Sequence, residues 1–344
     1  MKRILIIAML GLAMSMQAQV VKEQELAVVY YMPKTELVFT FTYQQVIRQA
    51  GPYAAYAKQM LGIENPITAT DTTYSIIDLQ TGTRTTADKE RVFKVPASKD
   101  LNTQYIALNE QGILRGYNIP NNRASKRSNN SSSLTAKQSN ITSGLTPLVI
   151  PFHEADLRGN SEKERAQKIA SQIFQIRETR MFILAGEVDH APADGVAMER
   201  VLNDLNETEQ QLVALFAGSV TTKTLERSFY YLPTQSEEVV LGNFNSKTGF
   251  GKGESIMLTI AAQKQVKLAP TAAPSKKDPQ PSHIYYNLPG EVHYSLIYRD
   301  NKLAERTVEA PHLGVSVPLT TDLFSKDVHI YFNPKTGNIQ SIYK

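Results

Sequence analysis

The final third of the chain, from residue 219 onward, constrains the fold most, because short runs of β-branched and aromatic residues alternate there with turn residues. Nine such runs can be read from the sequence, at 220–231, 239–244, 255–260, 284–288, 292–298, 307–309, 315–319, 328–332 and 339–343. Short strands separated by turns at this spacing favour antiparallel pairing with neighbours along the chain. The sequence therefore predicts a β-rich α+β protein whose antiparallel sheets are sandwich-like or curved.

Two of these turns share the pattern Phe-Asn-x-Lys-Thr-Gly, at residues 244–249 and 332–337. Asn or Pro at the start of a type I turn, closed by Gly in the left-handed conformation, is typical of a hairpin with a bulge. A second internal similarity is found between Tyr-Tyr-Met-Pro at 30–33 and Tyr-Tyr-Leu-Pro at 230–233. An internal duplication explains both similarities, and so does chance convergence on residues that favour turns.

The region 19–117 is predicted to be β-rich with one short helix. Residues 36–43 form the clearest strand, and Gly51-Pro52 opens a helix that stops at Gly62. Further strands are expected at 73–79, 91–95 and 104–108, separated by turns at 80–82 and 110–112.

The region 144–344 is predicted to begin with two amphipathic helices in the middle of the chain, at 161–179 and 196–217, followed by the antiparallel β region. Ser161 and Glu164 have the spacing of a capping box, and Gly218 lies where a helix-ending glycine belongs. The Asn/Ser-rich stretch 118–143 contains almost no apolar residues, which predicts a disordered insert or linker. Residues 270–282 contain four prolines and are predicted to form an extended loop.

The N-terminus predicts export. Lys2 and Arg3 precede an apolar run from 4 to 14, and Ala18 supplies a small residue for cleavage, so residues 1–18 are interpreted as a signal peptide, with cleavage after Ser15 as the alternative. The apolar run is too short to cross a bilayer. The mature chain is expected to have no transmembrane segment and to be periplasmic, outer-membrane-associated or extracellular.

Composition excludes several classes of function. The chain has no cysteine, which removes disulfides, thiolate metal sites and cysteine nucleophiles. Its formal net charge is only +4, without a basic stripe, so no nucleic-acid partner is expected. Residues 249–255 are glycine-rich but lack the spacing of a phosphate-binding loop. No cofactor or metal is predicted.

One cluster of polar residues is a weak candidate for catalysis. Glu187, Asp189, His190 and Asp194 fall within a short stretch, and carboxylates beside an imidazole can bind a metal or carry out general acid–base catalysis. Their spacing matches no zinc or calcium signature, and the alternative interpretation is a polar loop between the two helices. A separate motif, Asp71-Thr72-Thr73, is similar to the triplet that receives O-linked glycans in exported Bacteroidota proteins, which makes Thr72 a possible acceptor.

Three segments carry a family resemblance. These are residues 30–37 (Tyr-Tyr-Met-Pro-Lys-Thr-Glu-Leu), residues 51–57 (Gly-Pro-Tyr-Ala-Ala-Tyr-Ala) with Leu61-Gly62, and residues 334–339 (Pro-Lys-Thr-Gly-Asn-Ile). They resemble a family of exported Bacteroidota proteins classed only as a domain of unknown function. The resemblance implies a Gram-negative envelope setting and assigns no catalytic residue.

The sequence thus favours a non-enzymatic binding or structural protein of the cell envelope, with an envelope protein or a glycan as its possible partner. The alternative is a periplasmic hydrolase that uses the carboxylate and histidine cluster.

Overall fold

The fold is that of a computed structural model, which describes residues 27–96, 103–119, 161–187, 195–264, 283–319, 324 and 327–344. Within these ranges the protein is β-rich, with three antiparallel sheets and a pair of long helices, as the sequence predicts. The predicted signal peptide 1–18, the loop 270–282 and the insert 118–143, apart from its first two residues, lie outside the described residues. The division into regions 19–117 and 144–344 stays a prediction, although strands from both regions pair with each other.

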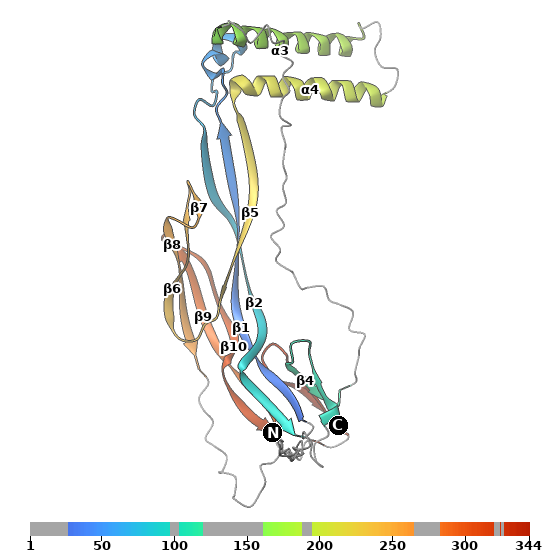
Figure 1. The fold of residues 1–344 in the computed structure, drawn as a ribbon, viewed down its shortest axis with the longest axis vertical. Helices are drawn as coiled ribbons and strands as arrows, with labels where there is room; N and C mark the ends of the chain where they lie inside the picture. The colour runs from blue at the N-terminus through green and yellow to red at the C-terminus, as the bar shows by residue number, and fades with distance from the viewer. Residues whose placement is uncertain are drawn as a thin grey trace, which may run out of the picture.

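A long three-stranded ribbon forms the axis of the molecule (Figure 1). Its central strand is β1 (Ala27–Gln49), flanked by β2 (Asp71–Pro96) and β5 (Ser219–Tyr231), both antiparallel to it. Alternate side chains of β1 are buried, among them Leu37, Phe39 and Phe41. Because successive side chains of a strand point to opposite faces, one face of β1 supplies this apolar row.

A five-stranded sheet packs against the middle of the ribbon, in the order β10-β9-β8-β6-β7. Its strands are β6 (Glu237–Asn245), β7 (Gly249–Phe250), β8 (Glu254–Gln263), β9 (Ile284–Tyr298) and β10 (Asn301–Leu319). The apolar row of β1 meets Ile256, Leu258 and Tyr294 there, and the rings of Phe39 and Tyr294 contact edge to face with centroids 5.3 Å apart. Two facing sheets with a shared core match the predicted sandwich-like arrangement.

A small sheet lies at the end of the ribbon where β1 begins (Figure 1), in the order β12-β11-β4-β3. It contains β3 (Ile106–Leu108), β4 (Leu114–Tyr117), β11 (His329–Phe332) and β12 (Ile339–Tyr343), with a 3-10 turn, η2 (Thr103–Tyr105), before β3. Its apolar residues join Tyr30 and Met32 of β1 in a second core.

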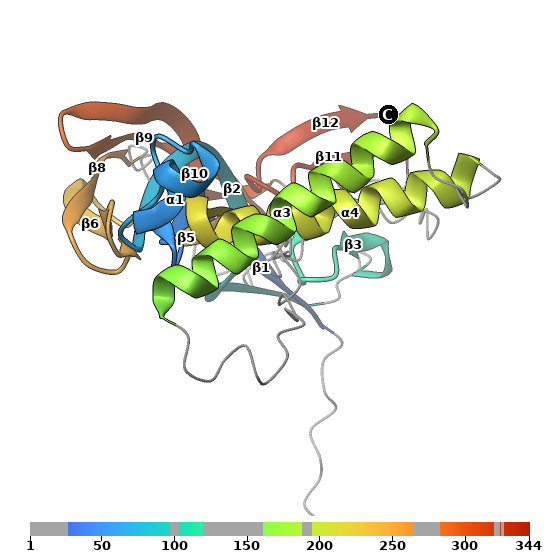
Figure 2. The same cartoon turned by 90° about the horizontal axis from the view of Figure 1, so that it is seen from above.

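The helices stand at the other end of the ribbon. The short helices η1 (Ala54–Tyr56) and α1 (Ala57–Leu61) follow β1, and the long helices α3 (Glu162–Ala185) and α4 (Gly195–Ala217) form an antiparallel pair that projects sideways (Figures 1 and 2). Among the described helices, none combines the length and the apolar content that a bilayer crossing requires.

Several strands are longer than the sequence predicts: β1, expected over 36–43, spans Ala27–Gln49, and β2 joins two of the expected strands. The expected turn at 80–82 is wrong, because Gln80, Thr81 and Gly82 pair in register with Thr40, Phe39 and Val38 of β1 and β2 continues through them. Pairing with a long neighbouring strand overrides local turn propensity here.

The break expected at Leu288-Pro289-Gly290 is also wrong, since β9 continues through it. Pro289 has no N–H to donate, but it lies opposite a bulge of β10, between the register positions Ala310 and Val315, where no ladder hydrogen bond is lost. The two runs at 307–309 and 315–319 are accordingly one strand, β10, with that bulge inside it.

Both Phe-Asn-x-Lys-Thr-Gly segments form the predicted turns, with Gly249 and Gly337 in the left-handed conformation at φ of 72° and 75°. The side chains of Asn245 and Asn333 each accept a hydrogen bond from the backbone two residues further on. The two turns belong to different sheets, and whether they reflect a duplication stays open.

Candidate functional site

The pair α3 and α4, here called the arm, projects from the end of the ribbon (Figure 1). Its formation follows from local sequence. Ser161 accepts a hydrogen bond from Glu164 N–H at 3.3 Å while the Glu164 carboxylate accepts from Ser161 N–H at 2.8 Å, which is the predicted capping box. Gly186 ends α3 and Gly218 follows α4, both with positive φ.

The root of the arm is well buried. Ile169 and Ile173 of α3 pack with Phe216 of α4 and Ala57 of α1 in a third core. The ring of Tyr53 lies 5.6 Å from that of Phe216, and Tyr53 N–H donates to Leu215 O at 2.9 Å. These contacts fix the arm to the end of the ribbon.

Ion pairs hold the two helices together beyond the root. Arg177 Nε and Arg180 Nη1 of α3 each lie 2.6 Å from an oxygen of Glu209 on α4. Burial raises the pKa of the Glu209 carboxyl, but the two guanidinium groups outweigh this effect, so the net shift is downward. Glu209 is therefore held in its charged form between two cations.

The distal half of the arm exposes large apolar side chains. Phe174, Met181, Phe182 and Leu184 on α3 and Val196 on α4 have exposed fractions of 51, 69, 45, 67 and 78%. Single exposed apolar residues are ordinary, but several on one projecting element are typical of an interaction site.

Three of these residues lie on one flank of α3. Phe174 and Met181 are seven residues apart and Leu184 is three further on, a spacing that keeps side chains on the same side of a helix. Arg177 lies between them in this row, with its guanidinium carbon 5.7 Å from the centre of the Phe174 ring. We call Phe174, Arg177, Met181 and Leu184 the α3 flank. Such a row suits docking of a partner surface and offers no group for acid–base chemistry.

The predicted catalytic cluster belongs to the stretch of sequence between α3 and α4. Glu187 is exposed just beyond the end of α3, while Asp189, His190 and Asp194 lie outside the described residues. The structure therefore leaves this cluster a prediction. Within the described ranges, no group of three or more His, Asp or Glu side chains is arranged to hold a metal ion.

Thr72 lies near the start of β2, paired with Ile47 of β1, and its side chain is half-buried. It is thus part of the ribbon, one residue into the strand, and its modification stays a prediction. The exposed His293 lies on β9, with Nε2 3.2 Å from a carboxylate oxygen of Glu305 on β10.

The α3 flank was not among the residues that the sequence singled out. Its signal was present, because Phe174 and Met181 depart from the stripe formed by Ile169, Ile173 and Ile176, the side of α3 that faces the core. A helix whose apolar residues occupy two flanks indicates a second contact beyond the one within the fold.

The fold and the arm together define a class: an elongated, β-rich α+β protein that carries a projecting helical arm at one end of a ribbon. The sequence matches the family described as a domain of unknown function, DUF4831, over residues 26–340, and the chain belongs to this family. No curated protein and no solved structure matches the chain.

Proposed function

We propose that this protein is an exported, non-enzymatic component of the cell envelope that binds a partner protein through its arm. The observation that carries the proposal is the cluster of large apolar side chains exposed on the α3 flank. Burial of one such side chain contributes about 1.5–3 kcal/mol. Several side chains buried together offset a large part of the cost of association, so the flank would form the centre of a larger interface.

The shape of the molecule supports a binding role. The root of the arm is fixed by buried contacts and its middle by the ion pairs of Glu209, so the flank is presented on a rigid element. A preformed surface loses little conformational entropy on binding.

Export rests on the N-terminal pattern of Lys2 and Arg3 followed by an apolar run. The proposed location is the periplasm, the outer membrane or the cell exterior. N-terminal sequencing of the native protein tests this part. A chain that begins at residue 19 or 16 supports export, and a retained Met1 in a cytosolic fraction contradicts it.

The binding role is tested by affinity capture from envelope fractions with three forms of the protein. The wild-type protein should recover a partner, and the double variant Met181→Lys/Leu184→Lys should lose it. Val240→Lys is the matched control, because Val240 is also exposed (54%) but lies on β6, away from the arm. Equal recovery by all three forms would contradict docking through the flank.

A glycosidase, peptidase or esterase activity that disappears in Asp189→Ala and His190→Ala would replace this proposal by the hydrolase alternative. Retention of the same activity in Met181→Lys/Leu184→Lys would separate the two roles.

A further inference from the structure

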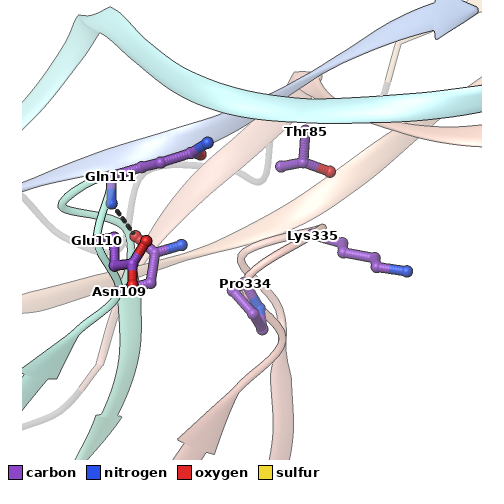
Figure 3. Close-up of a pocket in the computed structure, with 6 residues that line it drawn as sticks. All are labelled: Thr85, Asn109, Glu110, Gln111, Pro334 and Lys335. Atoms are coloured by element: carbon purple, nitrogen blue, oxygen red, sulfur yellow. Dashed lines mark hydrogen bonds between the residues drawn. The ribbon is translucent and has the colours of Figure 1, made fainter. Parts of the chain in front are cut away.

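A cleft of about 330 Å³ lies away from the arm, beside β2. It is lined by Thr85, Asn109, Glu110, Gln111, Pro334 and Lys335. Figure 3 shows the residues of the β3–β4 turn on one side, Pro334 and Lys335 of the β11–β12 turn on the other, and Thr85 on the strand that crosses above them. The cleft thus joins three segments that are far apart in the sequence.

The first wall is a turn that holds itself rigid. The Asn109 side-chain oxygen accepts hydrogen bonds from the N–H groups of Gln111 and Ile113, each at 2.9 Å. The turn is also tied to the ribbon, since Tyr31 N–H donates to Gly112 O at 2.9 Å. The side chains of Glu110 and Gln111 are exposed at this fixed position.

The second wall is the turn that contains Pro334 and Lys335, and it is held in the same way. Asn333 Oδ1 accepts from Lys335 N–H at 2.9 Å, and Asn333 O accepts from Gly337 N–H at 2.7 Å. Behind it, the fully buried Asn287 of β9 donates from its side chain to Thr336 O at 2.9 Å and from its backbone to Gly337 O at 2.8 Å.

Asn287 is itself fixed by a polar network between two strand bulges. Arg91 lies in a bulge of β2 and donates to Asn287 Oδ1, to Ser316 Oγ and to Pro311 O, each at 2.7 Å. Pro311 lies in the bulge of β10 described above. Bulges re-aim side chains in this way beside binding sites, and here they support one wall of the cleft.

The polar groups of the cleft are mixed and balanced. Glu110 supplies a negative charge, Gln111 an amide and Thr85 a hydroxyl, and Lys335 carries a positive charge on the opposite wall, with its side chain extending away from Glu110 (Figure 3). Pro334 adds an apolar ring. Pockets with a few convergent polar groups and an apolar surface orient small ligands by hydrogen bonds.

The walls offer little to the backbone of a peptide. A peptide usually adds to an exposed strand edge through main-chain hydrogen bonds, or inserts side chains into apolar pockets. Here the N–H groups of Gln111, Lys335 and Gly337 are already used inside their own turns. The groups left to bind a ligand are the side chains that line the cleft, which together offer hydrogen-bond donors and acceptors. Such a set matches a ligand rich in hydroxyl groups.

We propose that this cleft is a second binding site, separate from the arm, and that it takes a short stretch of glycan. The hydroxyl groups of a sugar both donate and accept, so they match the carboxylate of Glu110, the amide of Gln111 and the hydroxyl of Thr85, and an apolar face of a sugar ring matches Pro334. Because the two walls are already ordered, binding requires little rearrangement of the protein.

The test is isothermal titration of the purified protein with chitotriose, cellotriose, maltotriose and N-acetyllactosamine, together with an uncharged tripeptide. At least one sugar should bind, and Glu110→Ala and Lys335→Ala should each weaken that binding about tenfold or more. The matched control is Lys247→Ala, since Lys247 occupies the same place in the other Phe-Asn-x-Lys-Thr-Gly turn but does not line the cleft. Its affinity should equal that of the wild-type protein.

Absence of binding by all four sugars, binding that Glu110→Ala and Lys335→Ala leave unchanged, or binding of the tripeptide alone would each overturn the proposal. Glu110 and Lys335 are exposed, so both variants should fold, and an unchanged circular dichroism spectrum checks this. Capture of a partner by the arm should persist in Lys335→Ala, so failure of this inference and failure of the proposed function are distinguishable.

Discussion

The Arg91 guanidinium donates a hydrogen bond to the side-chain oxygen of Asn287 at 2.7 Å and thereby joins β2 to β9 across the interior of the molecule. Burial lowers the pKa of Arg91, and the charge of Asp88 opposes that lowering. A buried cation is stable only when it is hydrogen-bonded. The burial of Arg91 therefore requires its acceptors on Asn287, Pro311 and Ser316.

Replacement of Asn287 by Leu should destabilise the protein by about 2–4 kcal/mol, because Arg91, Pro311 O and Thr336 O each lose a buried partner. Urea unfolding measures this difference. Asn301→Ala, at an exposed position at the start of β10, serves as the control and should stay within about 0.5 kcal/mol of the wild type. An unchanged unfolding midpoint in Asn287→Leu would show that the network contributes nothing to stability.

Stability should decrease when the pH falls through the range in which histidine titrates. His312 Nδ1 accepts from Thr35 N–H at 3.4 Å and its Nε2 lies 2.5 Å from Pro233 O, an arrangement that suits the neutral ring. Burial lowers the pKa of His312 below the usual value of 6.5, and the hydrogen bond to Pro233 O and the charge of Asp88 offset this only in part.

With a lowered pKa in the folded state, the unfolded chain takes up the proton first as the pH falls. The contribution of His312 is therefore fully present above about pH 6.5 and is lost as the pH drops through the folded-state pKa. Urea unfolding at a series of pH values should show a shallower decline in His312→Gln than in the wild type. Identical slopes in His312→Gln and in the wild type would refute the assignment.

Gly51 should not tolerate a side chain. A Cβ atom there would lie 2.6 Å from Leu215 O, where α4 meets the ribbon. Gly51→Ala should cost about 1–3 kcal/mol and should speed amide hydrogen exchange near the C-terminal end of α4.

Gly82 is the matched control, since nothing lies within 4 Å of a Cβ placed there and its φ is ordinary. Gly82→Ala should be neutral or stabilising by up to about 1 kcal/mol. A loss of stability in Gly82→Ala would indicate that this position forms the turn suggested by its sequence and is not part of a continuous strand.

The Glu209 carboxylate should make a small contribution to the stability of the protein, and this contribution should depend on salt. Glu209→Gln should lower stability by about 1 kcal/mol, because both arginines of the pair are partly exposed and screened by solvent. The difference should shrink at high salt, whereas Glu199→Gln, at an exposed site on the same helix, should have little effect at either concentration. Urea unfolding followed by helical circular dichroism measures the stability of both variants.

Local signals predicted the elements whose ends are defined by capping and turn chemistry. The capping box at Ser161, the stops at Gly62 and Gly218 and the two Asn-initiated turns are all present, because each depends on residues close in sequence. The lengths of β2, β9 and β10 were wrong because they depend on partners far away. Gln80 continues a strand only because Thr40 lies opposite, and Pro289 is tolerated only because β10 bulges there.

The contrast between local signals and distant partners also explains which features of the two proposed sites could be predicted from the sequence. Asn333 and Lys335 could be assigned to a turn from the sequence, but nothing local shows that this turn faces Glu110. The α3 flank was visible in the spacing of Phe174 and Met181, yet its exposure depends on where α4 and the ribbon leave α3 uncovered.

The length of β1 has a consequence for what the molecule can do with two partners. Between Thr35, opposite the cleft residue Thr85, and Gln49, at the root of the arm, the strand spans roughly 45 Å at about 3.3 Å per residue. From Leu37 to Arg48 it is paired on both sides, which makes this stretch a stiff strut. With the two proposed sites at its ends, this strut would set the distance between a sugar-bearing surface and a docked protein.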